Sequence, residues 1–383
     1  MNGSINGAPV LETPVPLVDL DRLESNLDRM AAYARSHGLA LRPHTKTHKS
    51  PLVGGEQLRR GAVGLTCATL LEVETMVEAA DDILLAYPPV GSSKLERLME
   101  LPARLDLTVA LDSLTVAEQL GRAARARGRT IGVYLELDLG LRRVGLAGIE
   151  DVLALARAVA AMPSLEYRGI TFYPGHIRGP VDGHRPELDR LRTALQAVIG
   201  KLRAAGLEPK VVSGGSTPTV WRSHEIDGVT EIRPGTYVYN DRTTAQIGAC
   251  DWSDCALTVL ATVVSTAVPG QAVIDAGSKA LGREPGQAEG DGFGALLDRP
   301  EVTVQRLSEE HGILDLKESA WRPAVGELVR VVPNHVCIAV HLHEVIYGIR
   351  GDRLETSWPV VARGRRQIHQ EGSRRELGLG SRV

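Results

Sequence analysis

The sequence predicts an α/β protein built from a (β/α)8 TIM-type barrel and a mostly β second domain. Between Leu17 and about Tyr239, short apolar runs alternate with amphipathic helical stretches, a pattern typical of a parallel sheet covered by helices. About eight such units fall within this length, which favours a closed barrel over an open doubly wound sheet. After Asp241 the long helical periodicity disappears and β-like segments follow.

The barrel strands are expected at eight runs, which read LALRPH, VGLTCA, ILLAYP, LTVALD, GVYLEL, GITFYP, KVVSGG and EIRPGT. The clearest helical stretches between them are LLEVETMVEAA, SLTVAEQLGRAARARG, IEDVLALARAVAAM and PELDRLRTALQAVIGKLRAAG. Another helix is expected before the first strand, from about Asp21 to Ser36, with Gly38 as its C-terminal stop.

We assign residues 21–240 to the barrel and residues 1–20 plus 241–383 to the β-rich domain. An early strand around Pro14–Leu20 precedes the barrel and could also pair with it. The later β-like segments are CALTVLATVVSTAV, GQAVIDAG, VTVQRL, GELVRVVPNHVCIAVHL and GDRLETSWPVVA. The final stretch, RGRRQIHQEGSRRELGLGSRV, is polar and basic and is expected to be a mobile tail.

The composition is that of an ordinary globular protein, with 383 residues, 43% hydrophobic, 24% charged and a formal net charge of −3. Because the charge is near neutral and aromatic residues are scarce, no nucleic-acid partner is expected. The N-terminus lacks signal-peptide features, and no apolar run reaches the roughly 20 residues of a membrane span. Four cysteines are too few for a disulfide scaffold. We therefore expect a cytoplasmic protein without a membrane partner.

Catalytic residues of such a barrel lie at the C-terminal ends of its strands, and two turns there favour an anion. SGGSTPT follows the seventh strand and RPGTYV the eighth, where these barrels often bind phosphate. Their glycines let the backbone approach an anion, and their hydroxyls can donate hydrogen bonds. The candidates are Ser213, Gly214, Gly215, Ser216, Thr217, Gly235 and Thr236. Alternatively, the glycines only permit tight turns.

Lys46 lies near the end of the first strand, two residues from both His44 and His48. An amine that faces a phosphate site suits covalent attachment of a carbonyl cofactor. Nearby cations, Arg42, His44 and Lys49, would help to lower its pKa. From the spacing alone, a solvated loop lysine is an equal alternative.

The string RPHTKTHKSP resembles the reactive-lysine segment of the D-threonine aldolase and D-serine dehydratase family. The likeness continues in order through DLGLRRVG, YPGH, SGGSTPT, RPGTYV, DAGSKA and PNHVC, and covers nearly the whole chain. The resemblance implies an alanine-racemase-like architecture and a pyridoxal 5′-phosphate (PLP) cofactor that Lys46 binds covalently. It also implies that the two turns hold the phosphate, that Arg143 lies beside the cofactor, and that Tyr173 approaches the ring.

His335 and Cys337 lie two residues apart in the β-like run VRVVPNHVCIAVHL, and alternate residues of a strand face the same side. Such a pair suits zinc or a similar ion and leaves positions open for substrate, although the residues alone favour an ordinary half-buried strand. The resemblance implies a divalent metal here, zinc, manganese or magnesium. D-Threonine aldolases pair the histidine with a carboxylate, whereas His-x-Cys is typical of the dehydratase branch. Cys250 and Cys255 are interpreted as structural.

Two reactions fit this pattern. In retro-aldol cleavage a base takes the proton of the β-hydroxyl, a task suited to neutral histidine, and His176 in YPGH matches the proposed base of D-threonine aldolases. In β-elimination the hydroxyl leaves while Lys46 takes the α-proton. We weight His176 above Cys337 and predict a PLP- and metal-dependent, D-threonine aldolase-like lyase. It would cleave a D-3-hydroxy amino acid to glycine and an aldehyde.

The main alternative is a D-serine dehydratase-like lyase that gives a 2-oxo acid and ammonia. An amino-acid racemase would leave the His-x-Cys pair without a purpose, and a PLP carrier protein would resemble the barrel alone. Because members of the family usually form dimers, the resemblance also implies a homodimer.

Overall fold

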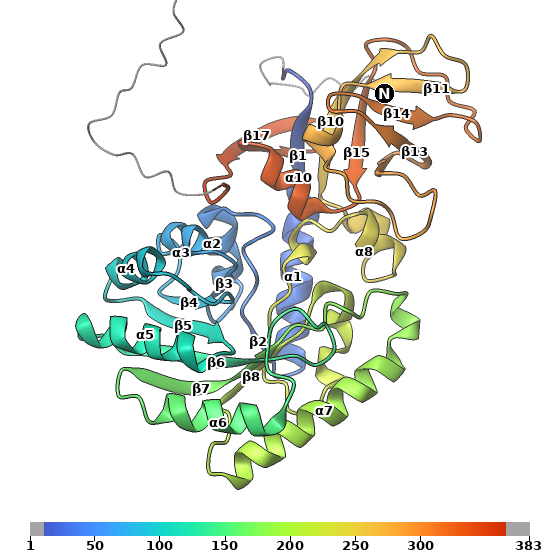
Figure 1. The fold of residues 1–383 in the computed structure, drawn as a ribbon. Helices are drawn as coiled ribbons and strands as arrows, with labels where there is room; N and C mark the ends of the chain where they lie inside the picture. Colours follow the sequence, from blue (N-terminus) through green and yellow to red (C-terminus); the bar gives the residue numbers. More distant parts are fainter. Residues whose placement is uncertain (1–10, 365–383) are drawn as a thin grey trace, which may run out of the picture.

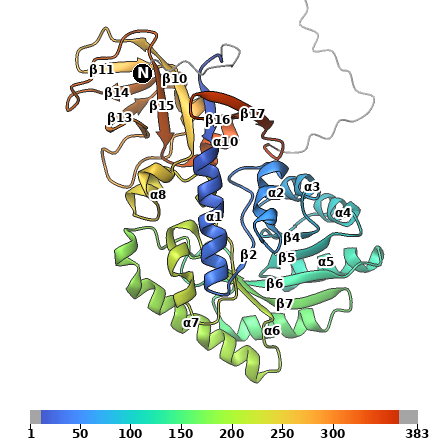
Figure 2. The ribbon, with the colours of Figure 1, turned by 180° about the vertical axis from the view of Figure 1, so that it is seen from behind.

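Two β-sheets organise residues 11–364, the part of the chain that the computed structural model describes (Figures 1 and 2). One is a curled parallel sheet of eight strands, and the other is a nine-stranded, mostly antiparallel sheet. The predicted fold class, an α/β barrel followed by a β domain, is confirmed. The basic stretch at the C-terminus lies, apart from residues 363–364, outside the described residues.

The parallel sheet contains all eight predicted runs, in the order β2-β9-β8-β7-β6-β5-β4-β3. The strands are β2 (Ala40–Leu41), β3 (Leu65–Cys67), β4 (Asp82–Leu85), β5 (Asp106–Leu111), β6 (Ile131–Leu137), β7 (Leu165–Phe172), β8 (Val211–Gly214) and β9 (Glu231–Ile232). Its two edges meet, because Val63 N donates to Leu41 O at 2.9 Å and Thr66 N to Pro43 O at 2.8 Å. These bonds join the first strand segment to β3.

Helices follow most barrel strands and surround the sheet (Figure 1). They are α1 (Leu20–Ser36), α2 (Pro51–Arg59), α3 (Leu70–Met76), α4 (Ser92–Glu100), α5 (Leu114–Ala126), α6 (Ile149–Ala160) and α7 (Arg185–Ala204). In α6, residues Val152, Leu155, Ala156 and Val159 are buried, the spacing that places apolar side chains on one helix face. After β8 and β9 the chain instead forms short 3-10 helices, η2 (Thr217–Glu225) and η3 (Thr236–Val238).

The second sheet has the order β11-β14-β13-β12-β15-β10-β1-β16-β17. Its strands are β1 (Val15–Asp19), β10 (Leu257–Ser265), β11 (Gln271–Ile274), β12 (Gly294–Leu296), β13 (Arg299–Leu307), β14 (Gly312–Asp315), β15 (Leu328–Pro333), β16 (Val345–Arg350) and β17 (Arg353–Pro359). The remaining short elements are η1 (Val181–Gly183), α8 (Arg242–Gln246), η4 (Trp252–Asp254), α9 (Ser278–Leu281) and α10 (Val336–Leu342).

The early strand pairs with the second sheet, so the expectation that it could pair with the barrel is wrong. β1 lies antiparallel to β10 and parallel to β16. The chain passes directly from β1 into α1, where Asp19 accepts a hydrogen bond from Arg22 N as the N-cap. β1 is thus a strand of the second sheet that leads directly into the helix before the first barrel strand.

The run from Leu328 to Leu342 is a strand followed by a helix, which corrects the prediction of one β-like run. β15 ends at Pro333, and the Asn334 side chain turns away to donate to Glu284 O and Gly292 O. In α10 the buried positions are Val336, Cys337, Ala339 and Val340, which is helical spacing. Within residues 11–364, no helix is both long and apolar enough to cross a membrane.

A buried ion network joins the first and last barrel strands. Arg42 Nε donates to Glu231 Oε2 at 2.7 Å, and its two terminal nitrogens donate to the Asp82 carboxylate at 2.6 and 3.0 Å. The Arg42 and Glu231 side chains are only 8% and 3% exposed. Removing the cation would leave a buried carboxylate without its partner.

We predict that Arg42→Met lowers the free energy of unfolding by about 3–5 kcal/mol, the cost of breaking a buried pair from one side. The control is Arg104→Met, since Arg104 pairs with Asp81 through side chains that are 58% and 72% exposed; it should cost at most about 1 kcal/mol. Urea unfolding followed by circular dichroism measures both. Equal losses in the two variants would contradict the buried network.

Candidate active site

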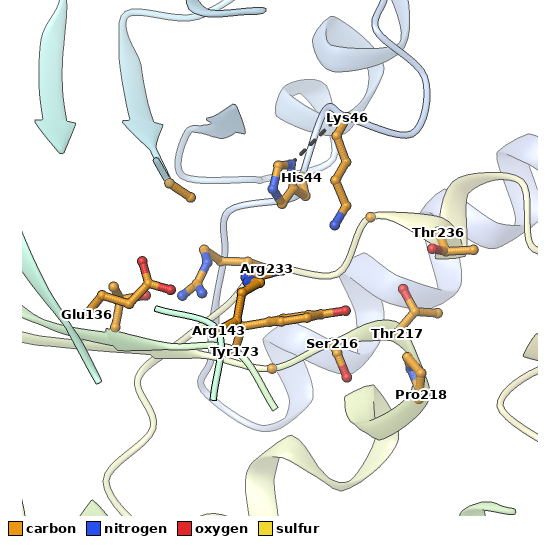
Figure 3. Close-up of a pocket in the computed structure, with 14 residues that line it drawn as sticks. His44, Lys46, Glu136, Arg143, Tyr173, Ser216, Thr217, Pro218, Arg233 and Thr236 are labelled. Atoms are coloured by element: carbon orange, nitrogen blue, oxygen red, sulfur yellow. Dashed lines mark hydrogen bonds between the residues drawn. The ribbon is translucent and has the colours of Figure 1, made fainter. Parts of the chain in front are cut away.

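An inner cavity lies at the C-terminal ends of the barrel strands and collects most of the predicted cofactor residues (Figure 3). The predicted residues that line it are Lys46, Arg143, Tyr173, Gly215, Ser216, Thr217, Gly235 and Thr236. Residues that the sequence analysis did not assign to this site also line it, namely His44, Ala86, Glu136, Thr171, Pro218 and Arg233.

Lys46 and Tyr173 face each other across the inner cavity. Figure 3 shows the Lys46 amine pointing toward the Tyr173 ring from the opposite wall. Lys46 Nζ lies 5.5 Å from the centroid of the Tyr173 ring, and Arg143 Cζ lies 5.2 Å from the same centroid. Two cationic groups thus converge on one aromatic ring, so the space between them suits a flat anionic molecule.

The two predicted turns form one end of the cavity, where Figure 3 shows Ser216, Thr217 and Thr236 close together. The Thr217 hydroxyl is buried and has no hydrogen-bond partner among the described residues. Gly215 has a φ of +102°, which an L side chain rarely adopts. A Cβ added at Gly235 would lie 3.1 Å from the backbone oxygen of His44. The cradle therefore combines an unpartnered donor with backbone that only glycine allows so close.

Ser213 and Gly214 do not line the cavity. The Ser213 hydroxyl donates to Glu231 Oε1 at 2.5 Å and accepts from Arg233 Nη1 at 2.6 Å. A Cβ added at Gly214 would meet the Phe172 ring at 2.2 Å. Both residues thus lie in the wall behind the cavity, and their predicted contact with a cofactor stays a prediction.

The cations expected around Lys46 are arranged differently from the prediction. Arg42 pairs with Asp82 and Glu231, and Lys49 Nζ donates to Glu72 Oε1 at 2.5 Å. Burial, with the charges of Lys46 and Arg233, holds the pKa of His44 well below its ordinary value. His44 is therefore neutral at pH 7.

Glu136 and Arg233 are the charged cavity residues that sequence reasoning missed. Burial raises the pKa of Glu136, and Figure 3 shows it at the end of the cavity opposite Thr217. Arg233 is buried and donates to Ser213 Oγ and Phe172 O. The available signal was a carboxylate inside the otherwise apolar strand IGVYLEL.

An outer cavity adjoins the inner one and shares Tyr173, Ser216, Pro218 and Thr236 with it. Its wall also contains His335 and Asp241, together with Arg178 and the segment 284–287. The outer cavity thus connects the barrel residues around Tyr173 to residues of the second half of the chain.

His335 and Cys337 lie at the N-terminal end of α10, where His335 is the N-cap. Cys337 Sγ lies 3.1 Å from Thr47 Oγ1 and 3.9 Å from Thr236 Oγ1, next to the Lys46 segment. Burial opposes ionisation of Cys337, but the neighbouring His335 and Lys46 outweigh it and lower the pKa of the thiol. The pair is thus held together beside the cavities by a helix end, not by alternation along a strand.

Asp241 orients this pair and was also missed from the sequence. Its Oδ2 lies 3.3 Å from His335 Nδ1 and accepts from Val336 N at 3.1 Å. Its Oδ1 accepts from Thr244 N at 2.8 Å and caps α8. A carboxylate on one ring nitrogen of a histidine is the usual support of a metal ligand. However, no group of three or more histidine, cysteine, aspartate or glutamate side chains within residues 11–364 is arranged to hold a metal.

His176, the predicted base, lies beside the site without lining either cavity. Its ring packs on the loop after β6, where a Cβ added at Gly140 would meet His176 Nε2 at 2.9 Å. His176 Nδ1 is buried and has no partner among the described residues. Its role as a base therefore stays a prediction.

Known protein families and relatives match both the barrel and the second part of the chain. A family model for the alanine racemase N-terminal domain matches residues 18–243, and one for a putative serine dehydratase domain matches residues 256–349. D-threo-3-hydroxyaspartate dehydratase of Delftia sp. (strain HT23) is 35% identical, over 85% of this chain and 91% of the relative. 3-Hydroxy-D-aspartate aldolase of Paracoccus denitrificans (strain Pd 1222) is 31% identical over 93% of each chain.

The chain belongs to the D-threonine aldolase and D-serine dehydratase family. The structure of D-threonine aldolase from Filomicrobium marinum is 34% identical, with a TM-score of 0.86 over 92% of this chain and 96% of that one. This is a family of PLP-dependent lyases. Structures of the Delftia dehydratase, at 32% identity and a TM-score of 0.83, include a histidine-to-alanine variant and a cysteine-to-alanine variant in the metal-free form.

The residues of the inner cavity fit the family's cofactor. PLP needs an amine for its carbonyl group and donors for its phosphate. Lys46 is the one lysine among the residues that line the inner cavity, and the unpartnered Thr217 hydroxyl lies in the glycine cradle. The two ends of the inner cavity thus carry groups that would suit the two ends of PLP.

We predict that Thr217→Val weakens PLP binding about 10- to 100-fold, since one hydrogen bond to a charged group is lost from a site of unchanged shape. PLP absorption during titration of the apoprotein gives the dissociation constant. Thr193→Val is the control, because the exposed Thr193 hydroxyl bonds only within α7. Equal affinities in the two variants would show that Thr217 does not hold the phosphate.

Proposed function

We propose that this chain removes water from D-3-hydroxy amino acids by β-elimination, with PLP and a divalent metal as cofactors. The substrate loses its α-proton and its β-hydroxyl, and the released enamino acid hydrolyses to a 2-oxo acid and ammonia. The observation that carries the proposal is the His335–Cys337 pair beside the Lys46 segment. His335 lines the outer cavity, Lys46 lines the adjoining inner cavity, and the Cys337 thiol lies 3.1 Å from Thr47 Oγ1, next to Lys46 in the chain.

Lys46 is proposed to hold the cofactor and then to take the α-proton at Nζ. PLP supplies the electron sink that makes the α-proton acidic. Tyr173 lies across the inner cavity from Lys46, with Arg143 beside its ring. The space between them therefore suits a flat group. The Thr217 and Gly235 turns orient that group by its anionic end.

His335 and Cys337 are proposed to bind the metal. A bound metal ion acts as a Lewis acid on the β-hydroxyl, which otherwise leaves poorly. An imidazole nitrogen and a thiolate favour zinc over the harder ions manganese and magnesium. The histidine and cysteine that are replaced in the dehydratase variants are two positions apart, as His335 and Cys337 are, which supports the same role here.

Retro-aldol cleavage to glycine and an aldehyde is the second candidate. It is supported by the aldolase relatives and by His176, whose buried Nδ1 has no partner among the described residues. The sequence favoured this reaction because of His176. We rank elimination first because His335 lines the outer cavity and Cys337 contacts the Lys46 segment, whereas the His176 ring packs on Gly140. A homodimer and a cytoplasmic location stay predictions of the family resemblance and the sequence.

We predict that the holoenzyme with zinc converts D-threonine to 2-oxobutyrate and ammonia in equal amounts. The His176→Ala variant should retain this activity, because elimination needs no base for the β-hydroxyl proton. Product assays by chromatography measure both. Acetaldehyde with glycine, lost in His176→Ala, would instead establish the aldolase. Conversion of D-threonine to its L-epimer at Cα, without release of ammonia, would indicate a racemase.

We predict that Asp241→Asn weakens zinc binding about 10- to 100-fold, because the carboxylate that supports His335 is replaced by a neutral amide. Asparagine caps helices as well as aspartate does, so α8 should be preserved. Competition with a chelator of known affinity gives the zinc affinity. The control is Asp251→Asn, at the cap of η4, which should leave it unchanged. Equal zinc affinity in both variants would contradict the role of Asp241.

A further inference from the structure

The Thr47 hydroxyl is a buried hydrogen-bond donor to which the proposed reaction assigns no role. Thr47 is 0% exposed, and its Oγ1 lies 3.1 Å from Cys337 Sγ. Among residues 11–364, the Cys337 thiol is the one hydrogen-bond partner of this hydroxyl. The other hydroxyl near the sulfur, Thr236 Oγ1, is farther away at 3.9 Å. Because Thr47 is closed to bulk water, the sulfur is the atom that its hydroxyl can satisfy.

Thr47 lies in the turn that also carries Lys46. Thr45 ties this turn to the barrel, since its backbone N donates to Thr66 O at 2.8 Å. On the other side, a Cβ added at Gly235 would lie 3.1 Å from Thr47 Oγ1, so the neighbouring turn packs closely on the hydroxyl. Lys46 lines the inner cavity, whereas the next side chain, Thr47, contacts α10. The turn thus holds the hydroxyl against the sulfur by packing from both sides.

Binding of a metal by Cys337 would fix the direction of this hydrogen bond. In the free thiol, either the sulfur or the hydroxyl can be the donor. A cysteine that binds a metal is a thiolate and has no proton to donate, so the proton must come from Thr47. Hydrogen bonds to an ionised group are roughly twice as strong as neutral ones. Such a bond also draws charge from the sulfur, so that the metal keeps more of the positive charge on which a Lewis acid depends.

We propose that Thr47 is a positioning residue for the metal site, whose hydroxyl donates to the Cys337 thiolate, orients the sulfur and limits the charge that the sulfur gives to the metal. The inference rests on the proposed function, in which His335 and Cys337 bind the metal. Lys46 and Thr47 are adjacent in the chain. One turn of the barrel therefore sets both the amine in the inner cavity and the sulfur beside it.

The test is the thiolate-to-metal charge-transfer band of the cobalt-substituted holoenzyme, recorded as the difference from the zinc holoenzyme so that PLP absorption cancels. Thr47→Val keeps nearly the same shape but removes the donor. The band should move to longer wavelength, because a sulfur without this hydrogen bond gives up an electron more readily. Cobalt affinity, measured by competition with a chelator, should fall about 10- to 100-fold. Thr47→Ala should give the same shift, and Thr47→Ser, which retains the hydroxyl, should keep the wild-type band.

Thr45→Val is the matched control. Thr45 is also buried and lies in the same turn, but its hydroxyl donates to Thr66 O at 3.0 Å and lies 3.5 Å from the sulfur of a different cysteine, Cys67. Its replacement should leave the cobalt band unchanged. Circular dichroism and PLP absorption show whether each variant is folded and holds the cofactor.

A wild-type band position in Thr47→Val and Thr47→Ala would overturn the inference and leave the proposed metal site intact. The same shift in Thr45→Val as in Thr47→Val would overturn it as well, because the band would then report a general disturbance of the turn. If the wild-type cobalt protein had no thiolate band, Cys337 would not bind the metal, and the inference would fail together with the proposed function.

Discussion

The contact between α10 and the segment that follows β2 is the constraint on which the rest of the site depends. Cys337 Sγ and Thr47 Oγ1 lie 3.1 Å apart although 290 positions separate them in the chain. Val336 and Val340 of α10 belong to the same buried apolar cluster as Leu41 and Val53 of the barrel. Apolar burial, roughly 25 cal/mol per Å², thus holds His335 and Cys337 beside the segment that contains Lys46. Neither half of the chain forms the site by itself.

Asp241 connects the packing of the two sheets to the orientation of the His335 ring. It ends the barrel part of the chain, caps α8 with one oxygen, and holds His335 and Val336 with the other. One buried carboxylate therefore fixes the junction between the two sheets and the direction of the histidine ring. The outer cavity forms beside this junction, with Arg178 in its wall.

The sequence predicted the barrel well and the second domain less well, for a physical reason. Buried parallel strands are continuous apolar runs, so all eight could be found, and the turns with Gly215 and Gly235 follow from their positions at strand ends. A short apolar run such as VCIAVHL has no such signature, and only Asn334, through its contacts with Glu284 and Gly292, shows that the strand stops. Asp241 was missed because its contacts with His335 and Val336 are set by tertiary packing.

The most direct test asks whether Lys46, proposed to hold PLP, and the His335–Cys337 pair, proposed to bind the metal, act on the same substrate. Cobalt is exchanged for zinc in the holoenzyme, and D-threonine is added in a stopped-flow spectrometer that records the PLP band and the cobalt–thiolate band together. The account predicts that both bands change with the same rate and the same dependence on substrate concentration. A PLP band that responds while the cobalt spectrum stays constant, or a cobalt spectrum without a thiolate band, would contradict it.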